Sequence, residues 1–232
     1  MSKIININKL KIKLKKDTLL DLNFNITNNT ALIGESGSGK SLTLKTILNL
    51  LPQNLSADFD YTSDFELNYD NIGFIPQNPF TSLSPMTKIK NQFFCKKESM
   101  LLALKKVGLD SWILERFPNQ LSGGQLQRVV IAIAISKKIK LLLLDEPTTA
   151  LDEKNKKLII DLIKQLAKEF NLTLLFITHD IESIKDLCEN MIIIRKGKII
   201  QDGKTNEILQ NPNNEYTKTL IESNFKTREF RK

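Results

Sequence analysis

The sequence predicts an α/β fold built around a parallel sheet, and two observations support this. Runs of consecutive apolar residues, each about as long as a buried strand, recur in the second half of the chain. Between them lie segments whose apolar residues follow helical spacing. Continuous apolar strands alternating with amphipathic helices are typical of a parallel sheet covered on both faces. The expected strands are 141–144, 173–177 and 191–195, and the expected helices are about 153–169 and 180–189.

The first half of the chain predicts shorter strands and a lobe of helices. Residues 20–26 alternate between apolar and polar, which is the period of a half-buried strand. After a turn at Asn28-Asn29, further elements are expected at 31–33 (strand), 41–50 (helix, ended by Pro52), 53–71 (small strands and loops) and 72–75 (strand). Residues 85–135 predict helices, with Gly108 as a C-cap, a loop at 121–125 and a second helix to about 136. Lys196-Gly197 predicts a hairpin turn.

Length and composition fit one sizeable core. The 232 residues are 41% hydrophobic and 26% charged, which excludes wholesale disorder. The lysine-rich first 16 residues have no continuous apolar core, so no signal peptide is expected, and no apolar run approaches the roughly 18 residues of a membrane span. Cys95 and Cys188 have no metal-binding spacing and predict no disulfide framework. We expect a soluble, cytoplasmic chain.

The net charge of +8 comes mainly from lysine, since the chain holds few arginines. We interpret it as charge spread over solvated faces, with attraction to nucleotide phosphates, an anionic membrane surface or nucleic acid as the alternatives. Aromatic residues do not interleave with the basic ones, so nucleic acid is not an expected partner.

The clearest motif is a phosphate-binding loop at residues 34–41. Its sequence, GESGSGKS, matches G-x-x-x-x-G-K-[ST] and lies between an apolar strand and an expected helix. Glycines let backbone N–H groups turn inward around phosphates, and a helix N-terminus favours an anion. Lys40 is expected to neutralise the β- and γ-phosphates, and the Ser41 hydroxyl to ligate Mg²⁺.

Two carboxylates follow the apolar strand 141–144. Ligands of open parallel sheets bind at the carboxyl ends of strands, where Asp145 and Glu146 are expected. Asp145 is placed to hold Mg²⁺ through a water, and Glu146 to orient or deprotonate an attacking water. Taken alone, the pair is more typical of a solvated turn before Pro147.

Three further segments each fit both a structural and a functional role when taken alone. His179 follows the strand 173–177, where a neutral imidazole can contact a γ-phosphate and a water, although a lone histidine is usually structural. Gln77 follows the strand 72–75 in a segment that otherwise reads as a turn. In the sequence LSGGQ at 121–125, Ser122 reads as an N-cap, and the N–H groups of the two glycines are able to receive a phosphate.

Taken together, these motifs resemble the ABC ATPases, in the order typical of that family and over about residues 4–222. The resemblance implies a P-loop NTPase fold with a RecA-like parallel sheet core, a small antiparallel β subdomain and a helical lobe at about 80–136. It implies one ABC ATPase domain at 1–222, followed by a basic tail at 223–232. ATP would be bound by Gly34, Glu35, Ser36, Gly37, Ser38, Gly39, Lys40, Ser41 and Leu42. Glu146, His179 and Gln77 would be catalytic, and Ser41, Gln77 and Asp145 would hold Mg²⁺.

The resemblance also implies partners. Two ATPase subunits, identical or paralogous, would pair head to tail, so that Leu121, Ser122, Gly123, Gly124 and Gln125 act on ATP bound by the other subunit. Asp152 would communicate between the two sites. Two membrane permeases and, indirectly, an extracytoplasmic binding protein would complete a transporter at the cytoplasmic face of the membrane. The family usually has an adenine-stacking aromatic residue where this chain has Leu14.

The finer resemblance is to peptide and nickel importer ATPases. It lies in QNPFTSLSP at 77–85 and in NPNNEYTKTL at 211–220. The chain ends about twelve residues later without the cysteine-containing extension usual in oligopeptide importers, which favours nickel or a metal chelate as the substrate. Peptide import is the alternative. A non-transport ABC ATPase acting on DNA or ribosomes is a third reading, disfavoured by the single set of motifs.

Overall fold

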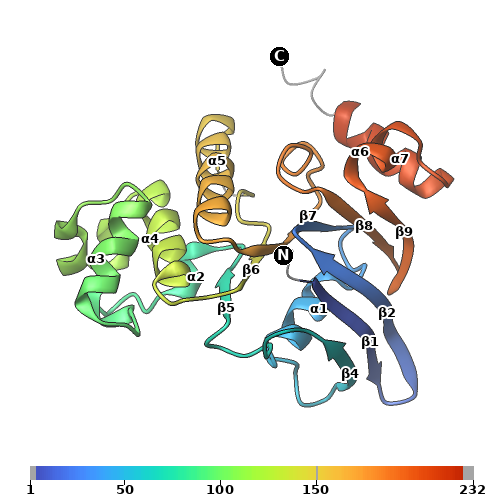
Figure 1. Ribbon diagram of the computed structural model, residues 1–232, viewed down its shortest axis with the longest axis horizontal. Coiled ribbons are helices and arrows are strands. Elements are labelled where there is room, and N and C mark those ends of the chain that lie inside the picture. The colour runs from blue at the N-terminus through green and yellow to red at the C-terminus, as the bar shows by residue number, and fades with distance from the viewer. Residues whose placement is uncertain (1–3, 150, 227–232) are drawn as a thin grey trace. The chain divides into compact units, whose positions relative to one another are not determined.

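The computed structural model describes residues 4–149 and 151–226 and divides into two compact units (Figure 1). One unit is formed by the chain up to residue 68 together with the chain from residue 173, and the other by residues 69–172. Within the described residues, no helix combines the length and apolar character needed to cross a membrane.

The first unit opens with an antiparallel sheet. Its strands are β1 (Ile4–Leu14), β2 (Asp17–Thr27) and β4 (Ser56–Thr62), in the order β2-β1-β4. The alternation at 20–26 is confirmed, because Leu20, Leu22, Phe24 and Ile26 are all buried while the residues between them are exposed.

The same unit contains a sheet built on parallel strands. β3 (Asn29–Ile33) lies between β7 (Thr173–Thr178) and β8 (Asn190–Arg195), and both pairings are parallel. β9 (Lys198–Lys204) joins β8 antiparallel through the predicted hairpin turn. Lys196 and Gly197 both have positive φ there, as tight hairpin turns require. The parallel strands are almost entirely buried, which confirms the expectation from their apolar sequences.

Three helices belong to this unit: α1 (Lys40–Ile47), α6 (Thr205–Gln210) and α7 (Glu215–Lys226). α1 ends well before Pro52, because Asn49 takes a left-handed conformation and the Leu50 N–H turns back to the Lys45 carbonyl at 2.7 Å. α7 continues beyond residue 222, so the first residues of the expected tail are helical. Residues 227–232 lie outside the described part of the chain.

The helix predicted at 180–189 is wrong, because the segment forms a series of turns. Asp180 makes local bonds at the start of this segment. Its carboxylate accepts the Glu182 N–H at 3.1 Å and the Ser183 hydroxyl at 2.7 Å, and the Thr178 hydroxyl accepts the Asp180 N–H at 2.9 Å. After them, backbone N–H groups bond to the carbonyls of Ile181 and Ile184, in i→i+3 and i→i+4 turns that do not continue as a helical ladder.

The second unit pairs β5 (Ile72–Ile75) parallel with β6 (Leu141–Asp145). Its helices are α2 (Pro79–Ser82), α3 (Lys97–Lys106), α4 (Gly123–Ile135) and α5 (Glu153–Glu169), and its 3₁₀ turns are 89–92, 111–115 and 118–120. α5 and the end of α4 match their predictions, and Gly108 follows α3 with a positive φ. The expected loop at 121–125 is too long, because Ser122 already caps α4 and residues 123–125 are helical.

Candidate active site

The phosphate loop (residues 34–41) connects β3 to α1 in the first unit. Lys40 is buried, and its ammonium group donates hydrogen bonds to the carbonyls of Gly34 at 2.6 Å and Glu35 at 3.0 Å. The Ser38 N–H donates to the Glu35 carbonyl at 3.1 Å. The loop therefore folds around its own lysine, as expected for a cradle that presents one cation and several N–H groups to an anion.

Two loop glycines are required by the chain itself, Gly34 by packing against backbone and Gly39 chiefly by its backbone conformation. A Cβ atom on Gly34 would lie 2.3 Å from the Ile194 carbonyl oxygen. Gly39 has φ of 112°, and a Cβ there would lie 2.4 Å from the Leu20 side chain. The turn after β8 also contacts the loop, since the Gly197 N–H donates to the Ser38 carbonyl at 3.0 Å. β2, β8 and the hairpin turn thus fix the shape of the loop.

His179 belongs to the same unit and the same strand edge. Ile33 and Thr178 are register partners at the carboxyl ends of β3 and β7, and the phosphate loop and His179 follow them directly. The His179 side chain is exposed. The register therefore places these two predicted elements at neighbouring strand ends, as expected for an open parallel sheet.

The second unit brings Gln77 and Glu146 together. Ile75 and Leu144 are register partners, so both segments leave their sheet at one edge. The Gln77 Nε2 donates to Glu146 Oε2 at 3.1 Å, and the Thr149 hydroxyl donates to the same oxygen at 3.1 Å. Glu146 also has a positive φ of 45°, which is uncommon for a residue with a side chain and is concentrated at functional sites. Asp145 ends β6 and is half-buried.

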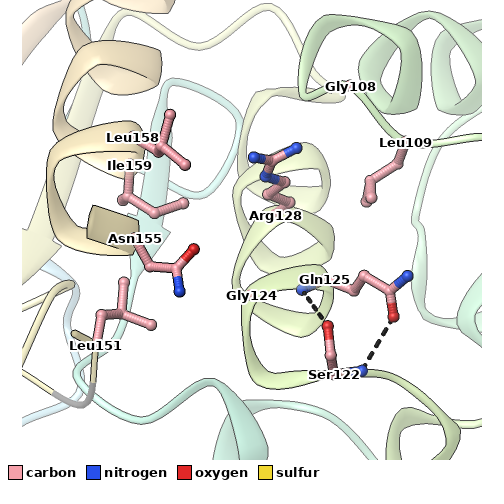
Figure 2. Close-up of a pocket in the computed structure, with 10 residues that line it drawn as sticks. All are labelled: Gly108, Leu109, Ser122, Gly124, Gln125, Arg128, Leu151, Asn155, Leu158 and Ile159. Atoms are coloured by element: carbon pink, nitrogen blue, oxygen red, sulfur yellow. Dashed lines mark hydrogen bonds between the residues drawn. The ribbon is translucent and has the colours of Figure 1, made fainter. Parts of the chain in front are cut away.

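The signature segment (residues 121–125) forms the start of α4. The Ser122 hydroxyl accepts the Gln125 N–H at 3.3 Å, and the Gln125 side chain accepts the Ser122 N–H at 3.0 Å (Figure 2). This reciprocal pair is a capping box, which confirms the N-cap reading of Ser122. A Cβ on Gly123 or Gly124 would meet no atom of the described chain within 4 Å, so neither glycine is required by internal packing.

A pocket of about 290 Å³ opens beside the signature segment. Arg128 of α4 lies on one side, and Asn155 and Ile159 of α5 lie on the other (Figure 2). Asp152 caps α5, because its carboxylate accepts the Asn155 N–H at 2.9 Å and the Asn155 side-chain amide at 2.6 Å. These bonds lower the pKa of Asp152 below its ordinary value. Ala150, between Glu146 and Asp152, lies outside the described residues.

Sequence reasoning did not single out three residues near these motifs. Thr149 lies between Glu146 and Asp152, and its bond to Glu146 has no signal of its own in the sequence. Arg128 follows the signature segment on the same helix and lines the pocket. Tyr216 lies in the carboxyl-terminal motif, and its hydroxyl accepts the Glu35 N–H at 3.3 Å.

Comparison with known proteins assigns the family. Residues 18–149, more than half of the chain, match the family model described as ABC transporter. The chain belongs to the ABC transporter family. It therefore has the ABC ATPase fold and carries the ATP-binding ATPase domain of that family, as the motifs predicted.

Individual relatives agree with this assignment. The chain is 33% identical to the oligopeptide transport ATP-binding protein AppD of Bacillus subtilis (strain 168), over 96% of this chain and 79% of that protein. It is 32% identical to the metal-staphylopine import system ATP-binding protein CntD of Staphylococcus aureus (strain NCTC 8325 / PS 47), over 87% of this chain and 84% of that protein. Some relatives are longer, and this chain spans 62% of one and 40% of another.

A solved ABC transporter structure has the same fold. The structure of cbiO1 from Clostridium perfringens, described as part of the ABC transporter complex cbiONQ, superposes with a TM-score of 0.78 at 25% identity. The match covers 91% of this chain and 92% of that one.

Proposed function

We propose that this chain is the ATP-hydrolysing motor subunit of an ABC importer. The observation that supports this best is the Glu146 carboxylate, which leaves the end of a buried strand at a strained φ and accepts the Gln77 amide at 3.1 Å. A carboxylate oriented in this way is suited to align and deprotonate a water that attacks the γ-phosphate, giving ADP and phosphate.

The remaining residues supply binding and charge. The loop N–H groups and Lys40 bind the phosphates, and His179 contacts the γ-phosphate. The hydroxyl of Ser41, the carboxylate of Asp145 and the amide oxygen of Gln77 are hard oxygen donors of the type that Mg²⁺ prefers. Bound with ATP, Mg²⁺ would offset the negative charge of the β- and γ-phosphates.

Assembly follows the pattern of the family. Two ATPase subunits, identical or paralogous, pair head to tail, and Ser122 and Gly124 contact ATP held by the partner, with Asp152 relaying between the sites. Gly123 and Gly124 of the signature segment support this role, because a Cβ atom added to either would meet no described atom within 4 Å. The backbone there is open to a ligand of the partner. Permease subunits in separate chains and an extracytoplasmic binding protein provide the path and the selection of substrate, with this subunit at the cytoplasmic face.

We infer short peptides as the first substrate candidate and a metal chelate as the second. Relatives named for oligopeptide transport, including AppD, OppD and AmiE, are more frequent among the similar proteins than relatives named for metal import, such as CntD. That difference moves peptides ahead and leaves a metal chelate, nickel included, as the specific alternative.

Uptake by cells lacking this chain tests the proposal. Labelled peptide and labelled nickel are supplied side by side, and the wild-type chain, Glu146→Gln or the control Glu207→Gln is returned. Glu207 is exposed on α6. We expect peptide uptake to return with wild type and Glu207→Gln and not with Glu146→Gln, whose amide keeps an acceptor oxygen but cannot take a proton. Restoration of nickel uptake alone would establish the second candidate, and a defect in neither would contradict both.

A further inference from the structure

The carboxyl-terminal motif at 211–220 has no role in the ATP site described so far, yet one of its residues touches that site. Tyr216 lies in the first turn of α7, and its hydroxyl oxygen accepts the backbone N–H of Glu35 at 3.3 Å. Glu35 is the second residue of the phosphate loop, and its carbonyl accepts the Lys40 ammonium at 3.0 Å. A side chain of α7 therefore holds the peptide unit at the entrance of the loop.

The Tyr216 ring is itself fixed by β8. The guanidinium of Arg195, the last residue of β8, lies over the ring at 4.4 Å from its centroid, within cation–π range. The chain then turns at Lys196-Gly197, and the Gly197 N–H reaches the Ser38 carbonyl at 3.0 Å. Burial raises the pKa of the Tyr216 hydroxyl above its ordinary value, so the phenol stays neutral near pH 7.

The other end of α7 contacts the segment that follows His179. The Asn224 side-chain carbonyl accepts the Ile181 N–H at 3.1 Å, and its amide donates to the Leu220 carbonyl at 3.0 Å, which orients the group. Ile181 is fully buried and lies two residues after His179. Tyr216 and Asn224 are eight residues apart, about 12 Å along a helix. One helix thus bonds to both segments that flank the proposed γ-phosphate position in this unit.

We propose that α7 is a positioning element for nucleotide binding, in which Tyr216 fixes the phosphate loop and Asn224 fixes the segment carrying His179. This inference rests on the proposed ATPase function and adds two positioning residues to it. The two contacts predict different effects. Loosening the loop should weaken every nucleotide whose phosphates it holds, whereas loosening the His179 segment should weaken only a nucleotide that has a γ-phosphate.

The test compares ATP and ADP affinity of the full chain with Tyr216→Phe, Asn224→Ala and Asn224→Asp. Tyr216→Phe keeps the ring over Arg195 and removes only the acceptor, so we expect both dissociation constants to rise about two- to tenfold, the range of one hydrogen bond. The Glu35 amide should exchange its hydrogen faster. Asn224→Ala should raise the dissociation constant for ATP and not for ADP, and Asn224→Asp, which keeps an acceptor oxygen, should restore it.

Tyr61→Phe is the matched control, because the Tyr61 hydroxyl accepts the Leu67 N–H at 3.2 Å in the same unit and lies in β4. We expect it to leave both affinities unchanged. If Tyr216→Phe resembles Tyr61→Phe in nucleotide affinity and Glu35 exchange, or if Asn224→Ala weakens ATP and ADP equally, the inference is overturned while the proposed function stands. A wild-type chain that binds neither nucleotide would overturn the proposed function and this inference with it.

Discussion

The phosphate loop and the signature segment are both rich in glycine, but their glycines have opposite surroundings. In the phosphate loop, added Cβ atoms on Gly34 and Gly39 would overlap Ile194 and Leu20 of the same unit. In the signature segment, added Cβ atoms on Gly123 and Gly124 would meet nothing in the described chain within 4 Å. The loop is therefore shaped by its own unit, whereas packing within the described chain places no such demand on the two glycines of the signature segment.

This contrast predicts different effects for substitutions in the two segments. Changes in the phosphate loop should show their effects in the isolated chain, through its stability and its affinity for nucleotide. Changes in the signature segment should be silent in the isolated chain and appear only in the assembled transporter. The first three predictions below test that division, and the fourth concerns the adenine.

The largest expected effect is that of Gly39→Ala. The new methyl group would overlap Leu20 and force an alanine into a left-handed conformation, so we expect a loss of about 2–4 kcal/mol in the free energy of unfolding. Gly37→Ala is the matched control, since Gly37 also has positive φ, 79°, but an added Cβ meets no described atom within 4 Å. Urea unfolding of both variants measures the difference. Equal losses would show that contact with Leu20 does not shape the loop.

Lys40→Ala comes next. Hydrogen bonds to charged groups contribute about 1.5–3 kcal/mol, so loss of the ammonium should weaken ATP binding by the isolated chain roughly tenfold to a hundredfold. Lys45→Ala, at an exposed position near the end of the same helix, should bind ATP like wild type. Calorimetric titration of both variants is the measurement. An unchanged affinity in Lys40→Ala would remove this lysine from the phosphate site.

Gly124→Ala should separate function from stability. The position is open and helical, so stability should stay the same or rise by up to about 1 kcal/mol, and ATP binding by the isolated chain should not change. Hydrolysis by the assembled transporter should fall at least tenfold, because the methyl group blocks close backbone approach to a phosphate. Lys97→Ala, an exposed position at the start of α3, is the control and should hydrolyse ATP normally. Normal hydrolysis in Gly124→Ala would contradict docking of the partner's nucleotide at this segment.

The sequence predicted the strands and helices around the motifs better than it predicted the turns. The strands before and after the motifs were predictable because continuous apolar runs and strict alternation are local patterns, and α5 had clear helical spacing. The turns at 180–189 were not, because the apolar spacing of this segment is that of a helix while its backbone bonds close separate turns on Ile181 and Ile184.

Contacts between distant segments were predictable only in part. The sequence placed Gln77 and Glu146 each directly after an expected strand, but it did not indicate that the amide of one would bond a carboxylate oxygen of the other. The contact between Tyr216 and the Glu35 N–H joins residues 181 positions apart and depends on how α7 packs, which no local pattern specifies.

The smallest expected effect concerns the adenine rather than the phosphates. Leu14 is half-buried at the end of β1, where the family usually has an aromatic residue. Stacking of a base on an aromatic ring contributes about 1–3 kcal/mol, so Leu14→Tyr should tighten ATP binding by the isolated chain about fivefold or more. Ile4→Tyr adds the same ring at the opposite, exposed end of β1 and should change nothing. If both variants bind ATP equally tightly, the gain is not stacking at the site. If neither binds more tightly, the adenine lies elsewhere, and nucleotide affinity in this chain depends on its phosphate loop alone.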